Sequence, residues 1–137
     1  MRTQQEIVEK INSLSDYIFD FERQDLLVRL DYENAKPFLK PETTQEIWDK
    51  ARSKILPVRE QMIDYMPFAW EKANDKRGIS AYRSICHYSA WLWLEGNDSL
   101  SEEIGDYEFY GKPQLIKICE YLGLDPNQWD DGIRENS

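Results

Sequence analysis

Histidine, cysteine and glycine are scarce in this chain of 137 residues, which has one histidine, two cysteines and six glycines. A zinc site built from cysteine and histidine, or a framework of several disulfides, needs more of these residues. Cys86 and Cys119 match no zinc-ligand spacing, and each has apolar neighbours in the sequence. We therefore expect two reduced thiols that pack as small hydrophobic side chains.

Basic residues are also few, since 17 lysines and arginines stand against 26 aspartates and glutamates, for a formal net charge of -9. An excess of negative charge opposes approach to phosphate backbones and anionic lipid, so direct binding of nucleic acid is disfavoured. No apolar run approaches the ~20 residues of a membrane span, and the first residues, MRTQQEIVEKI, are polar where a signal peptide is apolar. We expect a cytoplasmic protein without membrane contact.

Sequence motifs of common catalytic and cofactor-binding sites are missing as well. The chain has no glycine-rich phosphate loop, no dinucleotide-binding fingerprint, no nucleophile elbow and no HExxH zinc motif. A single histidine cannot supply the paired Glu-x-x-His motifs of a di-iron bundle, and no segment follows the EF-hand pattern. We expect no metal and no cofactor, and an enzyme is the less favoured class.

Apolar residues at helical spacing are the strongest pattern that the chain does contain. Near the N-terminus they predict a helix in which Thr3 and Glu6 form a capping box and whose apolar stripe reaches Phe21. Asp25 is then expected to cap a second helical piece that runs toward Ala35.

A longer helix is predicted over 43–73, where one apolar stripe keeps its phase throughout. Pro57 and Pro67 fall inside this stripe, and we expect them to bend the helix without breaking it. The next helix, over about 80–95, is apolar on almost all sides and should be buried at the centre of the fold.

The remainder of the chain is expected to hold a loop over 97–111 with at most one short helical turn around 101–104, a helix from Lys112 that ends at Gly123, and a short final turn. Residues 130–137 are expected to form a frayed acidic tail. The predicted fold is a single all-α domain over 1–137, a compact bundle of five or six helices around the central one.

One stretch concentrates residues capable of chemistry: ICHYSAWLWLEG, residues 85–96, holds the only histidine, one cysteine and two tryptophans. Adjacent residues on a helix point about 100° apart, so Cys86 and His87 cannot form a catalytic pair with each other. Trp91 and Trp93 point in nearly opposite directions, so at most one of them can line a shared ligand surface. We expect this stretch to be mostly core, with His87 at its rim.

Two groups of side chains remain as candidates for recognition, and none is assigned a catalytic or metal-binding role. Aromatic faces suit ligand or partner surfaces, and the candidates of this kind are His87, Trp91, Tyr107 and Tyr110. Clustered carboxylates suit an acidic face, and those candidates are Glu102, Glu103, Asp106 and Glu108.

Residues 113–129, PQLIKICEYLGLDPNQW, resemble the closing helices of Cro/repressor-type helix-turn-helix domains, which often show Leu-x-x-Ile-x-x-x-Leu-Gly before a short last helix. The preceding EEIGDYEFYGK is acidic and does not match a recognition helix, so the resemblance carries over no DNA-contacting residue. Over 80–131, with AWLWLEGND, YGKPQLIKICEYLGLD and WDD, the chain resembles small helical proteins of bacteria and phages. The resemblance implies a compact intracellular domain and no particular activity.

These features favour an intracellular protein-interaction or accessory module that binds a protein partner or associates with itself through exposed aromatic residues. One alternative is an acidic decoy that imitates nucleic-acid charge and blocks a basic partner, because acidic residues gather in the C-terminal third. A second alternative is an enzyme with an active site around Cys86 and His87.

Overall fold

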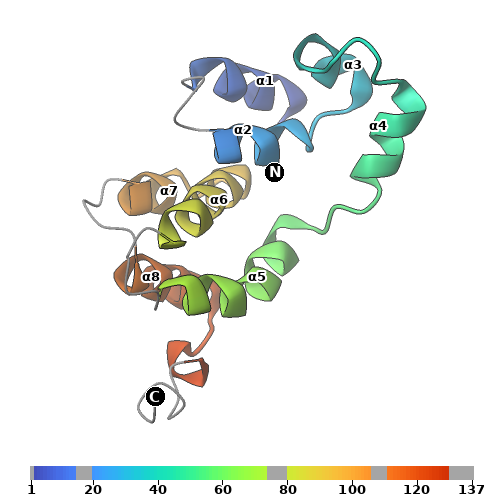
Figure 1. The fold of residues 1–137 in the computed structure, drawn as a ribbon. Coiled ribbons are helices and arrows are strands. Elements are labelled where there is room, and N and C mark those ends of the chain that lie inside the picture. Colours follow the sequence, from blue (N-terminus) through green and yellow to red (C-terminus); the bar gives the residue numbers. More distant parts are fainter. Residues whose placement is uncertain (1, 15–19, 74–79, 106–110, 130–137) are drawn as a thin grey trace.

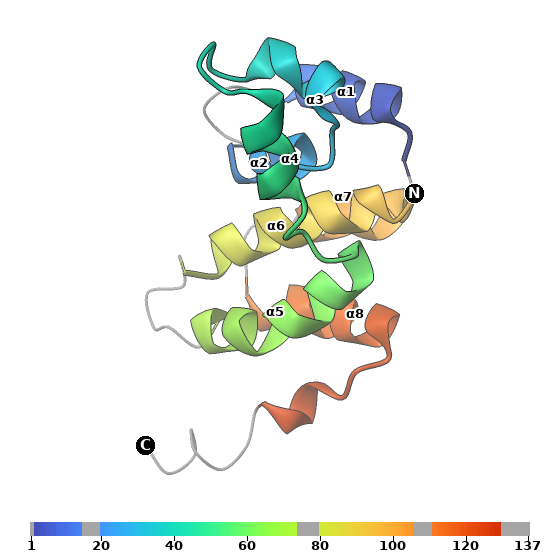
Figure 2. The same cartoon turned by 90° about the vertical axis from the view of Figure 1, so that its right-hand side faces the viewer.

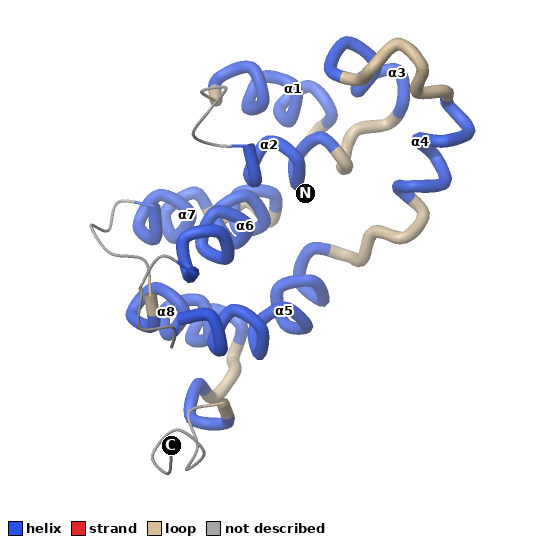
Figure 3. Tube along the Cα trace, viewed as in Figure 1, coloured by secondary structure: helices blue, strands red, loops and turns tan. Residues whose placement is uncertain are grey.

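The computed structural model describes residues 2–14, 20–73, 80–105 and 111–129. These ranges form eight α-helices and two short 3-10 helices, and they contain no strand (Figures 1 and 3). The helices are α1 Gln4–Ser13, α2 Asp20–Leu27, α3 Tyr32–Ala35, η1 Lys36–Phe38, α4 Gln45–Arg52, α5 Val58–Ala73, α6 Ser80–Leu94, α7 Asp98–Gly105, α8 Lys112–Leu122 and η2 Pro126–Gln128. The all-α prediction is confirmed, with more helices than the five or six expected. The predicted tail at 130–137 lies outside the described residues.

The helices pack in three layers, which are clearest in Figure 2. α1 to α4 form the first layer, α6 and α7 the middle one, and α5 with α8 the third. α6 contacts α2, α5 and α7, and most of its side chains from residue 84 to residue 94 are buried. None of the described helices combines the length and the apolar character that crossing a membrane requires.

The capping box predicted at the start of the chain is confirmed, but the helix behind it is shorter than expected. The Glu6 amide donates to Thr3 Oγ1 and the Thr3 amide donates to Glu6 Oε1, both at 3.1 Å. α1 then ends at Ser13, and a separate helix, α2, carries Phe21. Residues 15–19, between these helices, are outside the described ranges.

The prediction that Asp25 caps a helix toward Ala35 is wrong. Asp25 lies inside α2, and the chain leaves the helix soon afterwards. Asp31 provides the cap instead, because its carboxylate accepts the Asn34 amide at 3.0 Å where α3 begins. A side-chain cap stabilises a helix start by about 1 kcal/mol, which favours a new helix at this point. The Asp25 side chain instead faces α6, where it contacts His87.

Pro57 breaks the helix predicted over 43–73, and Pro67 does not. α4 ends before residues 53–57, which are non-helical, and α5 follows them. Pro57 has no amide hydrogen and disfavours helical angles at the residue before it. Pro67 lies on the exposed side of α5, which continues past it. The expectation of a bend without a break is therefore wrong at Pro57.

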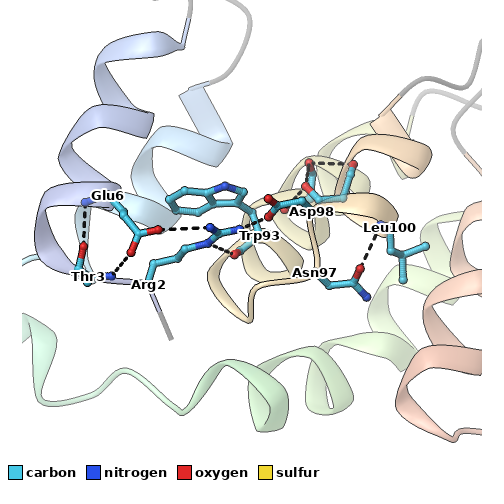
Figure 4. Close-up of polar contacts among 9 residues, drawn as sticks. Arg2, Thr3, Glu6, Trp93, Asn97, Asp98 and Leu100 are labelled. Carbon is cyan, nitrogen blue, oxygen red and sulfur yellow. Dashed lines mark hydrogen bonds and ion pairs between the residues drawn. The ribbon is translucent and has the colours of Figure 1, made fainter.

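The segment 97–111, expected to be a loop, contains α7. The Asn97 side chain accepts the Leu100 amide at 3.2 Å and so caps the start of this helix (Figure 4). Ser101 is buried, and its Oγ donates to the Ser89 carbonyl of α6 at 2.8 Å. An N-terminal cap together with packing against α6 stabilises a helix that is too short to persist alone.

Arg2 ties the start of the chain to the turn between α6 and α7 (Figure 4). Its Nε donates to the Trp93 carbonyl at 2.8 Å, and its guanidinium lies 4.4 Å from the Trp93 ring centre. Its remaining nitrogens pair with Glu6 and Asp98. Trp93 is half-buried beneath Arg2, whereas Trp91 is buried in the core.

The end of α8 follows the prediction. Gly123 adopts a φ of 74°, in the left-handed region that favours glycine, and the Leu124 amide donates to the Cys119 carbonyl at 2.9 Å. Beyond η2, Trp129 returns to the core and packs on Trp70, with 6.1 Å between ring centres.

Candidate functional site

Two hollows lie along the junction of α5 and α6 and adjoin at Tyr65, which lines both. Their volumes are about 360 Å³ and about 460 Å³. The first hollow is lined by Asp25, Leu56, Gln61, Asp64, Tyr65, His87 and Trp91, and the second by Phe21, Tyr65, Phe68, Lys72, Tyr82, Arg83 and Ser84. We call these residues together the α5–α6 groove.

The helical repeat of α5 brings its groove residues to one face. Each of them has another three or four positions away, the spacing of neighbours on a helix surface: Gln61, Asp64, Tyr65, Phe68 and Lys72. The adjoining face of α5 is buried in the core and carries Val58, Met62, Met66, Ala69 and Trp70. α5 therefore holds the groove residues on a support that is itself anchored.

Tyr65 stands at the middle of the groove with rings around it. Its ring centre lies 5.2 Å from that of Phe68 and 5.2 Å from that of Trp91, the latter edge to face. Its hydroxyl is 3.4 Å from Ser84 Oγ. Aromatic pairs in these geometries contribute about 0.5–1.5 kcal/mol beyond burial, so the ring is held in a defined position.

His87 is fixed by a carboxylate and by aromatic neighbours. Its Nδ1 contacts Asp25 Oδ2, although the two residues are 62 positions apart in the chain. The imidazole stacks on the Trp91 ring at 5.5 Å with an interplanar angle of 20°. The His87 and Asp25 side chains are 18% and 14% exposed, so the pair is reachable from solvent at the first hollow.

Two carboxyl groups of α2 lie in an environment that opposes ionisation. Burial raises the pKa of Asp25, while the neighbouring His87 and Trp91 act in the opposite direction. Burial also raises the pKa of Glu22 to about 7, and Lys10 partly offsets this effect. Loss of water around them therefore favours the neutral form of both carboxyl groups.

Neither thiol has the environment of a nucleophile. Cys86 and Cys119 are free and buried, as the sequence predicts, and burial raises the pKa of each to about 11. A thiol with such a pKa is protonated near neutral pH, whereas catalytic cysteines are deprotonated by nearby positive charge. The geometry therefore gives no support to an active site around Cys86 and His87.

No protein-family model, curated protein or solved structure matches this chain. Among the residues that the structure describes, no three His, Cys, Asp or Glu side chains are grouped as a metal site requires.

The structure brings some of the predicted recognition residues together. His87 and Trp91 both line the first hollow. Tyr107 and Tyr110 belong to the segment 106–110, outside the described ranges, and remain predictions.

The predicted acidic face is described only in part. Glu102 and Glu103 are exposed on α7, and Lys117 of α8 pairs with Glu103. Asp106 and Glu108 are not among the described residues. The acidic-decoy hypothesis therefore remains a prediction.

Most of the groove was missed by sequence reasoning, which assigned Asp25 to a helix cap and did not single out Tyr65. One signal was present in the sequence: Gln61, Asp64, Phe68 and Lys72 share the helical face of Tyr65, so that face is both aromatic and charged. The contact between Asp25 and His87 had no local signal, because it depends on how α2 packs against α6.

Proposed function

We propose that this protein is an intracellular protein-interaction module that holds a segment of a partner protein in the α5–α6 groove. The supporting observation is the groove itself, two adjoining hollows with aromatic walls and a few charged groups. Concave, largely apolar sites with a small number of polar groups are where proteins most often bind ligands. Two hollows that adjoin at Tyr65 can each take a side chain of the same partner segment, which favours a chain segment over a single small molecule.

Exposed apolar surface lies at both hollows and favours an apolar occupant. Phe68 is 46% exposed at the second hollow and Leu56 is 42% exposed at the first. Covering apolar surface contributes about 2.5 kcal/mol for each 100 Å² removed from water. A partner segment with apolar side chains would gain this contribution at both ends of the groove.

The groove is also pre-organised, which lowers the entropic cost of binding. Tyr65, His87 and Trp91 contact one another through their rings, and Asp25 holds the imidazole in place. Rigid aromatic side chains in a well-packed pocket are typical of the few residues that dominate the energy of an interface.

The chemistry of the chain supports a reducing, intracellular location for this binding. Both cysteines are free thiols, the state that reducing compartments maintain. The net charge of -9 supports a protein partner over direct contact with nucleic acid.

The alternative is that a second copy of this protein binds in the same groove. A second copy would bury the exposed apolar residues in a symmetric contact. Light scattering over a range of concentrations distinguishes the two, because a strict monomer argues against a second copy and leaves the partner segment as the occupant.

The test is selection of random peptides displayed on phage against the immobilised, folded protein. Enriched peptides are synthesised, labelled and titrated by fluorescence anisotropy into the wild type and into Phe68→Asp, which places a charge on the apolar wall without disturbing a buried residue. We expect the substitution to weaken binding by about tenfold or more, the scale of a hot-spot residue.

Ile47→Asp is the matched control. Ile47 is 58% exposed on α4 and is not a groove residue, so the same chemical change there should leave peptide affinity unaltered. The proposal fails if no peptide is enriched, or if the two variants weaken binding equally.

A further inference from the structure

The charged side chains of the α5–α6 groove are divided between its two ends. Asp25 and Asp64 line the first hollow, and Lys72 and Arg83 line the second. Among the described residues that line the first hollow, the His87 imidazole is the only basic side chain, and the described lining of the second hollow has no acidic side chain. The groove is therefore acidic at one end and basic at the other.

Asp25 already has partners inside the protein. His87 contacts its carboxylate, and Arg29 lies close enough to favour its ionised form. Arg29 itself is held by the Leu56 carbonyl at 2.9 Å and by the Gln61 side chain. Asp64 is the exposed carboxylate of this end, so a cationic group of a partner would meet Asp64.

At the other end, the two cations rest on aromatic rings. The Lys72 ammonium lies 5.3 Å from the Phe68 ring centre, and the Arg83 guanidinium lies 4.4 Å from that of Phe21. Neither forms an ion pair with a carboxylate of the described part of the chain. A guanidinium stacked on a ring keeps its in-plane N–H groups available, and these match the oxygens of a carboxylate.

The spacing of the charges follows from the two helices. α5 and α6 run antiparallel, since the first hollow joins Asp64 to Trp91 and the second joins Lys72 to Arg83. Asp64 and Lys72 are separated by eight positions on α5, or about 12 Å along the helix axis. An extended chain rises about 3.3 Å per residue, so about four residues span this distance.

We propose that the segment bound in the groove is extended and carries a basic and an acidic side chain about four residues apart, with apolar side chains between them. The basic side chain lies against Asp64, the acidic one against Lys72 and Arg83, and the apolar ones over Tyr65. This inference rests on the proposed function. A uniformly anionic ligand such as nucleic acid would be repelled at Asp64, and a uniformly cationic one at the opposite end.

The experiment compares peptides selected on two proteins. The first is the wild type, and the second carries Asp64→Lys, Lys72→Glu and Arg83→Glu, which exchange the charges of the two ends. All three positions lie at the surface of the groove, and circular dichroism verifies that the variant is folded. Lys50→Glu is the control, because it makes the same net change of charge on the exposed side of α4.

On the wild type we expect enriched peptides to share a basic and an acidic position about four residues apart, in one fixed order along the chain. On the exchanged protein the order of the two charges should reverse, and wild-type peptides should bind about tenfold more weakly. Lys50→Glu should select the wild-type order.

Enriched apolar peptides without the charge pair, or with the same order on both proteins, would overturn the charge pattern and leave the groove as a docking site. Failure to enrich any peptide on the wild type would overturn the docking site and the charge pattern together.

Discussion

Glu22→Gln should stabilise the protein at alkaline pH and have little effect at acidic pH. Glu22 lies on α2, half-buried, with Lys10 of α1, Asp25 of α2 and the Cys86 thiol of α6 as its ionisable neighbours. Burial raises its pKa from the ordinary 4.5 to about 7, more than Lys10 can offset. Glutamine has nearly the same shape as glutamic acid and never ionises, so it should fit the site at every pH.

The magnitude follows from the linkage between protonation and folding. Between about pH 4.5 and about pH 7 the folded state keeps a proton that the unfolded state has released, so the free energy of unfolding falls as the pH rises through this window. Each pKa unit corresponds to about 1.4 kcal/mol, which sets an upper limit of about 3 kcal/mol. Solvent screening of a half-buried carboxyl reduces this to about 2 kcal/mol. The substitution removes that cost above pH 7.

The assay is urea unfolding of both proteins near pH 4 and near pH 8, followed by tryptophan fluorescence. The higher free energy of unfolding of Glu22→Gln should appear near pH 8. It should vanish near pH 4, where Glu22 is protonated in both the folded and the unfolded state. Moderate salt should change the gain little, because burial is the main cause of the raised pKa. An equal effect at both pH values, or a loss of stability near pH 8, would show that burial does not raise the pKa of Glu22.

Three further predictions concern the core and the helix ends. Tyr88→Phe removes the buried hydrogen bond from the Tyr88 hydroxyl to the Met62 carbonyl, 2.9 Å long, and should lower the free energy of unfolding by about 1–2 kcal/mol in urea titrations. Gly123→Ala should lower the free energy of unfolding by about 1 kcal/mol because of the positive φ at that position. Gly105→Ala should be neutral or stabilising, because Gly105 has open space around it and no positive φ. Thermal unfolding compares the two variants. The two buried thiols, each with a pKa of about 11, should react with a thiol reagent near pH 8 far more slowly in the folded protein than in urea, and rapid modification of the folded protein would contradict their burial.

The fold could be predicted from the sequence wherever the signal was local. The reciprocal Thr3–Glu6 cap and the glycine that ends α8 have side-chain requirements that the sequence alone displays. The break at Pro57 was missed because the apolar residues on either side kept the same phase, which suggested one continuous helix. α7 was missed because its acidic, polar composition resembles a loop, although Asn97 offered a cap.

The candidate site was less predictable, because it depends on how separate helices pack. The sequence drew attention to His87 through its neighbours in the chain. It could not indicate Asp25 as the partner of His87, because α2 and α6 meet only in the folded protein. The sequence could not place Phe68 and Arg83 in the groove either, because each lies on a helix face that meets its partner helix only in the folded protein.

The docking of a partner segment in the α5–α6 groove is tested most directly by nuclear magnetic resonance of the protein with a peptide selected on the wild type. The five tryptophan indole N–H signals serve as positional markers, because Trp91 lines the groove while Trp48 donates its indole N–H to the Leu30 carbonyl and Trp93 lies beneath Arg2. If a partner segment docks in the groove, we expect the Trp91 signal to move and to saturate with the affinity measured by anisotropy, while the Trp48 and Trp93 signals stay in place. Saturable movement of the Trp48 or Trp93 signal with the Trp91 signal unmoved would show that the peptide binds outside the α5–α6 groove.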